Sequence, residues 1–123
     1  MGLHSADELA RSPFLGHVFE NMVILEMVKR ISASPFPYNL YFYRTLKGVE
    51  VDLLVESGGK MDAYEIKWTQ TPHHSMTSAL ETISKDYPIR NKAILAPITT
   101  PFPVSQGILA RPWHSVLLRS QDL

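Results

Sequence analysis

Residues 49–68 read VEVDLLVESGGKMDAYEIKW, and this stretch predicts the β-hairpin around which the rest of the chain is arranged. Two runs of alternating, β-branched and aromatic-rich sequence flank the dipeptide Gly58-Gly59. Glycine adopts the positive φ that a tight two-residue hairpin turn requires, so this dipeptide marks the turn. A turn at this point places Ser57 opposite Lys60 and thereby fixes the register of the hairpin.

Four charged residues share one face of the predicted hairpin. The register places Asp52 opposite Glu65 and Glu50 opposite Lys67, and side chains alternate between faces along a strand. Directly opposed residues have their Cβ atoms about 5 Å apart, and like charges placed in this way repel. The Asp52–Glu65 pair therefore needs a compensating cation, for which Lys67 and a bound Mg²⁺ are the two candidates.

Length and composition indicate a soluble, cytoplasmic protein with one ordinary core. The chain has 123 residues and no cysteine, which excludes disulfides and thiolate metal sites and favours a reducing compartment. Its apolar runs, such as residues 22–25, are far shorter than the roughly 20 residues of a membrane span, so no membrane partner is expected. Basic and acidic residues number 12 each, so the formal net charge is zero, which argues against a large basic nucleic-acid footprint.

The N-terminal part of the chain divides into an arm and a helix. We expect residues 1–12 to form a flexible arm and residues 13–123 to form a single domain. Ser12 is suited to cap a helix and Pro13 to occupy its first position, so a helix is predicted from there to about Ile31. This helix is apolar nearly all round, which is typical of a helix that is buried or shares one side with a partner.

One carboxylate interrupts the apolar surface of this helix. At 100° per residue, Glu20 falls beside Ile24, Met27 and Ile31. The far side carries Phe14, Leu15, Val18, Phe19, Met22 and Leu25. A buried carboxylate needs an ion or hydrogen-bond partners, so Glu20 either pairs with a lysine at the margin of the core or belongs to a site.

An aromatic strand is expected at residues 38–46, followed by a turn at Lys47-Gly48. If Leu46 lies opposite Val49, Tyr43 lies opposite Asp52 and extends the row of polar residues to a third strand. A bulge in either hairpin would shift this register by one residue.

The remaining elements complete a three-layer α/β/α fold with a mixed sheet. A helix is predicted at residues 74–87 and a strand buried on both faces at residues 91–98. A strand, a helix and a strand in this order indicate a right-handed crossover to a parallel neighbour, which adds to the antiparallel three-strand meander. The Pro-rich residues 99–107 read as a loop, and residues 107–118 as a short strand and a turn of helix.

The order of these elements, with Glu20 on the first helix, Asp52 on the second strand and E-x-K at residues 65–67, resembles the PD-(D/E)xK nuclease superfamily. This resemblance implies a restriction-endonuclease-like fold and a Mg²⁺-dependent or Mn²⁺-dependent DNA endonuclease. It also implies that Asp52 and Glu65 bind the ion and that Lys67 positions or activates the attacking water. Glu20 matches the helix carboxylate that archaeal-type Holliday-junction resolvases add.

The chemistry of these residue types agrees with the resemblance. Mg²⁺ prefers oxygen ligands and keeps several waters, so Asp52, Glu65 and the backbone carbonyl of Ile66 would suffice to hold it. Lys67 supplies a compact charge for the nucleophile or the transition state, and Glu20 could hold a second ion or orient a water. The alternative for the hairpin alone is a solvated ladder of salt bridges.

A closer resemblance covers almost the whole chain. FLGHVFENMVILEMVKR (residues 14–30), LYFYRTLKGVEVDLLVE (40–56) and YEIKW (64–68) look like the C-terminal domain of unknown function that follows the P-loop module in many prokaryotic AAA+-type ATPases. An ATPase module is therefore the implied partner. This chain has no G-x-x-x-x-G-K-[ST] loop and is not expected to bind ATP by that route. Val51 stands where many nucleases of the superfamily have a proline.

Two classes of function remain open. The first is a Mg²⁺-dependent nuclease-like domain acting on DNA phosphodiesters. The second is a non-catalytic interaction module that docks onto the ATPase or forms a homodimer. A domain that keeps the nuclease fold but lacks a groove for its substrate lies between them.

Overall fold

The computed structural model describes residues 12–117. The expected flexible arm lies outside this range except for Ser12. The helices are α2 (Pro13–Ala33) and α3 (Ser78–Asp86), with two short 3₁₀ helices, η1 (His74–Met76) and η2 (Trp113–Leu117). The strands are β1 (Asn39–Arg44), β2 (Glu50–Ser57), β3 (Lys60–Ile66), β4 (Ile89–Ala96), β5 (Phe102–Ser105) and β6 (Ile108–Pro112).

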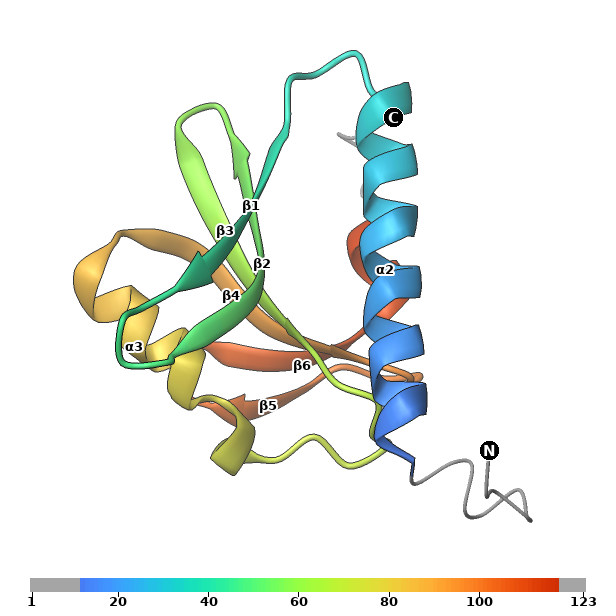
Figure 1. The fold of residues 1–123 in the computed structure, drawn as a ribbon, viewed down its shortest axis with the longest axis vertical. Coiled ribbons are helices and arrows are strands. Elements are labelled where there is room, and N and C mark those ends of the chain that lie inside the picture. The colour runs from blue at the N-terminus through green and yellow to red at the C-terminus, as the bar shows by residue number, and fades with distance from the viewer. Residues whose placement is uncertain (1–11, 118–123) are drawn as a thin grey trace.

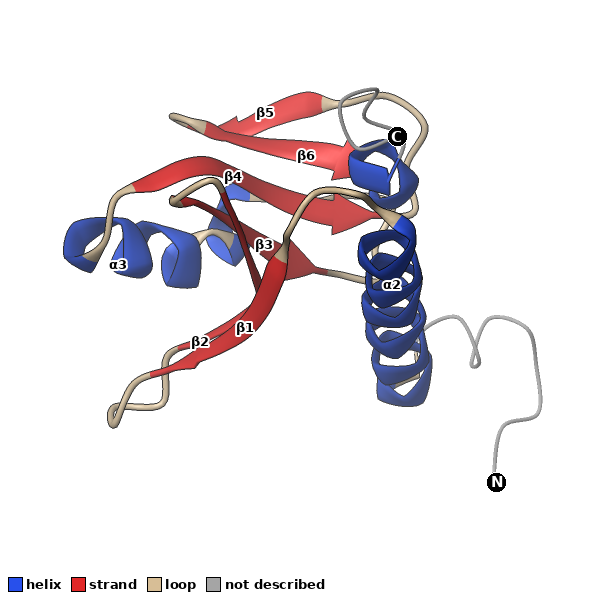
Figure 2. Ribbon diagram, turned by 90° about the horizontal axis from the view of Figure 1, so that it is seen from above, coloured by secondary structure: helices blue, strands red, loops and turns tan. Residues whose placement is uncertain are grey.

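The six strands form one mixed sheet in the order β1-β2-β3-β4-β6-β5. The first three strands are an antiparallel meander, and β4 lies parallel to both β3 and β6. Helices α2 and α3 lie on opposite faces of the sheet (Figures 1 and 2). The predicted mixed α/β architecture and the crossover from β3 through α3 to a parallel β4 are therefore confirmed.

Each face of the sheet has its own hydrophobic core. On one face, α2 buries Phe19, Val23 and Met27 against side chains of β2, β3 and β4. On the other face, α3 buries Leu80 and Ile83 against a second set from β2, β3, β4 and β6. The apolar end of β4 is buried on both faces, as its continuous apolar sequence predicted.

Helix α2 begins as the sequence predicted, because the Ser12 hydroxyl accepts a hydrogen bond of 3.1 Å from the Phe14 N–H. Phe19 was predicted to lie on the far side of the helix from Glu20, and this prediction is wrong. The buried side chains of α2 are Phe19, Val23 and Met27, so Phe19 faces the core. Five apolar side chains of the opposite stripe are exposed: Phe14, Val18, Met22, Leu25 and Val28. No helix within residues 12–117 is long and apolar enough to cross a membrane.

A β-bulge in the first hairpin corrects the predicted register. Tyr41 pairs with Leu54, but Tyr43 pairs with Val51, so Asp52 and Leu53 together lie opposite a single residue of β1. Tyr43 is therefore not opposite Asp52, and it packs on the face that α3 covers. Bulges redirect side chains at strand ends and next to active sites, and this one falls at Asp52.

Two downstream segments differ from the prediction. The Pro-rich stretch expected to be a loop contains β5, which pairs with β6 at the edge of the sheet. Proline is tolerated on an edge strand because no ladder partner needs its missing N–H on the open side. The predicted helix at residues 74–87 divides into η1 and α3 at Thr77, whose hydroxyl donates a 2.7 Å hydrogen bond to the His74 carbonyl.

A buried ion pair joins β3 to β4 on the side of the sheet away from the Asp52 end. Asp62 is 2% exposed, and its carboxylate accepts hydrogen bonds of 2.9 and 2.8 Å from the Arg90 guanidinium. The same carboxylate also accepts from the backbone N–H and the side-chain amide of Asn91. The sequence analysis did not anticipate this pair, which fixes where β4 meets β3.

We predict that Asp62→Ala lowers the free energy of unfolding by about 2 to 3 kcal/mol, because it removes a buried carboxylate that accepts four hydrogen bonds and joins β3 to β4. Urea denaturation measures this change. The matched control is Glu26→Ala, which removes only the exposed Glu26–Lys29 pair and should cost less than about 0.5 kcal/mol. Equal losses in the two variants would contradict the structural role of Asp62.

Candidate functional site

Each of the two carboxylates of the hairpin accepts a backbone N–H of the opposite strand at the point where the β2–β3 ladder ends. The predicted pairing of Ser57 with Lys60 is observed, and regular pairing continues as far as Leu53 and Tyr64. Beyond that point, the Asp52 N–H donates to Glu65 Oε1 at 3.2 Å and the Ile66 N–H donates to Asp52 Oδ2 at 2.8 Å. Each carboxylate thus takes over a hydrogen bond that a backbone carbonyl would otherwise accept.

Lys67 provides a cation beside this pair. Its Nζ lies 3.6 Å from Glu65 Oε2, and its side chain is 41% exposed whereas that of Glu65 is 6% exposed. The Lys67 N–H donates to the Leu95 carbonyl of β4 at 2.9 Å, so its backbone is held by the crossover strand. The predicted pairing of Glu50 with Lys67 is not observed, since the ladder ends before them.

Glu50 instead forms part of the first hairpin. It lies opposite Arg44, whose Nε is 3.1 Å from Glu50 Oε1, and both side chains are exposed. The bulge at Asp52 accounts for this arrangement, because it shifts the β1 register by one residue on the Glu50 side. Glu50 is therefore a surface ion-pair residue near the site.

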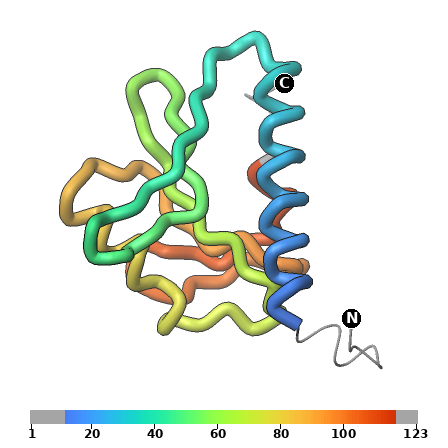
Figure 3. Tube along the Cα trace, viewed as in Figure 1, coloured from blue at the N-terminus to red at the C-terminus, as the bar shows by residue number. Residues whose placement is uncertain are grey.

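Glu20 reaches the site from α2. It lines a pocket of about 780 Å³ together with Lys67, between the N-terminal half of α2 and the segment that follows β3. These two segments lie side by side although they are far apart in the sequence (Figure 3). The structure thus brings Glu20, Asp52, Glu65 and Lys67 into one region, in which the Asp52 and Glu65 carboxylates accept backbone N–H groups across the strand end and Glu20 lies on the pocket wall.

Burial raises the pKa of all three carboxyl groups, and charges nearby modify each shift. Burial first and then the Asp52 charge raise the pKa of Glu65 to about 7, against the opposing effect of Lys67. Burial also raises the pKa of Asp52, although the Ile66 N–H and Lys67 act in the opposite direction. The pKa of Glu20 is raised first by burial and then by Asp52, which indicates that the two charges are close.

The donor set fits a cation held by two carboxylates. Asp52 Oδ1 and Glu65 Oε2 are not used in the bonds between the strands, and Ile66 follows Glu65 directly. Mg²⁺ needs only one or two protein carboxylates when waters and carbonyl groups complete its shell. Within residues 12–117, no three His, Asp or Glu side chains are grouped so that they could hold an ion together.

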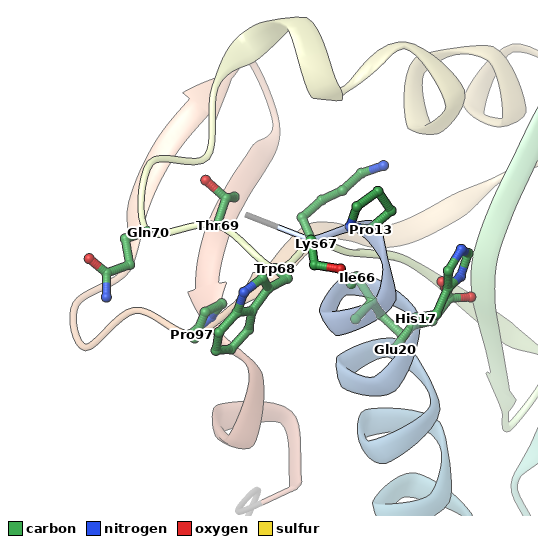
Figure 4. A pocket seen from close by; sticks show the side chains of 11 residues that line it. Pro13, His17, Glu20, Ile66, Lys67, Trp68, Thr69, Gln70 and Pro97 are labelled. Atoms are coloured by element: carbon green, nitrogen blue, oxygen red, sulfur yellow. The ribbon is translucent and has the colours of Figure 1, made fainter. Parts of the chain in front are cut away.

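Part of the pocket was not anticipated from the sequence. Trp68, Pro13 and Pro97 line it beside Lys67 and Glu20, and Figure 4 shows Trp68 next to Pro97. The exposed Trp68 directly after the E-x-K residues is the signal that could have pointed to this surface. Pro97 follows β4 and has no sequence signal of this kind.

The raised pKa of Glu65 predicts that stability falls as pH rises. The folded chain keeps a proton between the ordinary pKa of 4.5 and about 7, whereas the unfolded chain releases it. The stabilisation is fully present below pH 4.5 and is lost as pH rises to about 7, which amounts to about 2 to 3 kcal/mol. We expect Glu65→Gln to remove this dependence, and urea denaturation between pH 4.5 and 8 in metal-free buffer measures it. The Glu65 assignment fails if wild type and Glu65→Gln have parallel pH profiles.

Sequence comparisons agree with a family assignment over the described domain. Two mycobacterial proteins, uncharacterized protein Rv2008c of Mycobacterium tuberculosis and uncharacterized protein Mb2031c of Mycobacterium bovis, are each 31% identical over 117 residues. These residues are 95% of this chain but 25% of each relative, so the chain spans about a quarter of their length. No solved structure matches the chain. Residues 15–116 match the domain of unknown function DUF4143, and the chain belongs to this family.

Proposed function

We propose that this chain is a Mg²⁺-dependent, nuclease-like domain of the PD-(D/E)xK type that acts on DNA phosphodiesters. The proposal includes a restriction-endonuclease-like fold, with Mn²⁺ as an alternative ion. The observation that carries it is the placement of the Asp52 and Glu65 carboxylates across one strand end, where each accepts a backbone N–H of the other strand, with Lys67 Nζ 3.6 Å from Glu65. Two carboxylates that are largely desolvated and lie close together are costly unless a cation or a proton compensates them.

Each side chain has a role that follows from its position. Asp52 and Glu65 would hold the ion through the oxygens not used between the strands, with the Ile66 carbonyl as a third protein ligand. When bound, Mg²⁺ polarises a phosphoryl oxygen and lowers the pKa of a bound water. The Lys67 side chain is partly exposed, its backbone is held by β4 and its ammonium group lies beside Glu65, so it can donate to the attacking water or to a phosphoryl oxygen.

Glu20 has a supporting role in this proposal. Its pKa is raised by burial and by Asp52, so it is close enough to respond to a charge at the carboxylate pair. It lines the pocket opposite Trp68, where it can orient a water. We do not assign it a direct bond to the ion, because the described side chains form no three-carboxylate group.

We further propose that the domain works beside an AAA+-type ATPase module. The sequence resemblance supports this, and the mycobacterial relatives are about four times as long as the matched region, which is enough for such a module. A neutral domain has little charge with which to hold a phosphate backbone, so an adjoining module would supply most of the affinity for DNA.

The alternative is a non-catalytic module that pairs with a second copy of itself. The observation that favours it is the exposed apolar side of α2, where Phe14, Val18, Met22, Leu25 and Val28 recur at helical spacing. Apolar residues at this spacing on two helices can pack against each other. In this alternative the carboxylate pair contributes only to the structure of the hairpin.

The nuclease proposal predicts cleavage that depends on Asp52 and Glu65. We expect the chain with Mg²⁺ to cut at least one of branched, single-stranded and duplex DNA, measured by gel electrophoresis of labelled substrates. Asp52→Asn and Glu65→Gln keep the side-chain shape but remove the negative charge, and should each lower the rate about 100-fold or more. Glu56→Gln, at the far end of β2, is the matched control and should leave the rate unchanged. Equal background activity in the wild type and in Asp52→Asn would rule out this nuclease activity.

The interaction alternative predicts a dimer that depends on α2. Multi-angle light scattering would then give twice the chain mass for the wild type and the monomer mass for Leu25→Glu, because a charge in an apolar interface is costly. Leu25 is 59% exposed, so this substitution should leave the fold intact. A monomeric wild type at all tested concentrations would argue against self-association through α2.

A further inference from the structure

The pocket beside the carboxylates has an aromatic side that the proposed chemistry does not use. Trp68 and Pro97 lie at one side of the pocket, and His17 and Glu20 lie at the other (Figure 4). Lys67 contributes to the lining between Ile66 and Trp68 in the chain. An apolar, aromatic surface thus adjoins the cation that we assign to phosphate chemistry.

The Trp68 ring packs against an aromatic side chain of the core and is partly exposed to solvent. Its centroid lies 5.3 Å from that of Phe19, whose ring is itself packed edge-on against Trp113 at 6.4 Å. Trp68 is nevertheless 41% exposed. On either side of it the backbone is fixed by the hydrogen bonds from Lys67 N–H to Leu95 and from Thr69 N–H to Lys67. An aromatic side chain that is already ordered loses little conformational freedom when a ligand stacks on it.

The charge of the pocket excludes tight binding through phosphates alone. Lys67 is the only Lys or Arg among the described residues that line it, and Glu20 adds a negative charge. The whole chain has a formal net charge of zero. Affinity for nucleic acid from counterion release scales with the number of phosphates neutralised, which is small here. Another contact must therefore contribute to the affinity for nucleic acid. Stacking of a base on the exposed Trp68 indole is a contact that does not require phosphate neutralisation.

We propose that Trp68 binds an unpaired nucleobase of single-stranded DNA while Lys67 contacts a neighbouring phosphate. A base inside a duplex has both faces covered by its neighbours, so only an unpaired or terminal base can place a face against Trp68. Lys67 and Trp68 both line the pocket, and Figure 4 shows their side chains leaving the backbone in different directions, so a strand lying in the pocket can place a base on one and a phosphate on the other. This inference rests on the proposed function and specifies its substrate as single-stranded or end-frayed DNA.

Binding is tested without cleavage, in buffer containing EDTA. Fluorescence anisotropy of a labelled twelve-nucleotide oligo(dT) gives the dissociation constant for the wild type, Trp68→Phe, Trp68→Ala and Tyr87→Ala. We expect Trp68→Ala to weaken binding about tenfold or more and Trp68→Phe to retain most of the affinity, because phenylalanine still stacks. Tyr87 is an exposed aromatic residue on the α3 side and serves as the matched control, with no expected change. A blunt twelve-base-pair hairpin duplex should bind at least tenfold more weakly than oligo(dT).

Photocrosslinking locates the contact in the unmodified chain, so the test does not depend on how Trp68→Ala folds. A single-stranded oligonucleotide carrying 5-bromodeoxyuridine should give an adduct on Trp68, identified by mass spectrometry. An adduct on other aromatic residues instead, unchanged binding by Trp68→Ala, or equal binding of the duplex would overturn the inference. None of these measurements requires cleavage. A failure of base stacking on Trp68 is therefore distinguishable from a failure of the proposed Mg²⁺-dependent reaction.

Discussion

The Asp52 and Glu65 carboxylates join β2 to β3 where the backbone ladder stops, and the other features of the site follow from this contact. Each carboxylate accepts an N–H from the opposite strand, at 2.8 and 3.2 Å. Hydrogen bonds to a charged acceptor are stronger than neutral ones, so the contact holds the strand ends together. It also buries both carboxylates, which raises both pKa values, and the Asp52 charge raises the pKa of Glu65 as well. The contact that completes the hairpin therefore also creates a need for a cation or a proton.

The surrounding elements place this contact next to the pocket, whose lining includes the adjacent Ile66 and Lys67. The bulge in β2 turns Val51 into the α3 core while Leu53 stays in the α2 core, and Asp52 lies between them. The crossover strand holds the backbone of Lys67, and α2 brings Glu20 to the same region. Carboxyl groups with raised pKa values are thus gathered at one end of the sheet, whereas Asp62 at the opposite end is paired with Arg90 and hydrogen-bonded to Asn91.

A feature of this arrangement could be predicted from the sequence mainly where the interaction that determines it is local. The Gly58-Gly59 turn sets the register of its hairpin by backbone conformation alone, so Asp52 and Glu65 could be paired from the sequence. The period of α2 placed Glu20 beside Met27, which is buried, but it placed the buried Phe19 on the far side. The bulge opposite Phe42 depends on the packing of two cores and has no local signal. The strand β5 pairs with β6, the next strand in the chain, across a turn at Gly107, so this hairpin had a local signal that the proline-rich composition obscured. The pocket around Trp68 also needs residues from three separate segments.

The most direct test of the central claim is calorimetric titration of the chain with Mg²⁺, and with Mn²⁺, near pH 7. The account predicts one ion bound per chain, with proton release because the pKa of Glu65 is about 7 in the metal-free chain. It also predicts that Asp52→Asn abolishes this binding while the fold is retained. The absence of binding by the wild type, or undiminished binding by Asp52→Asn, would contradict the claim that this carboxylate pair is a metal site.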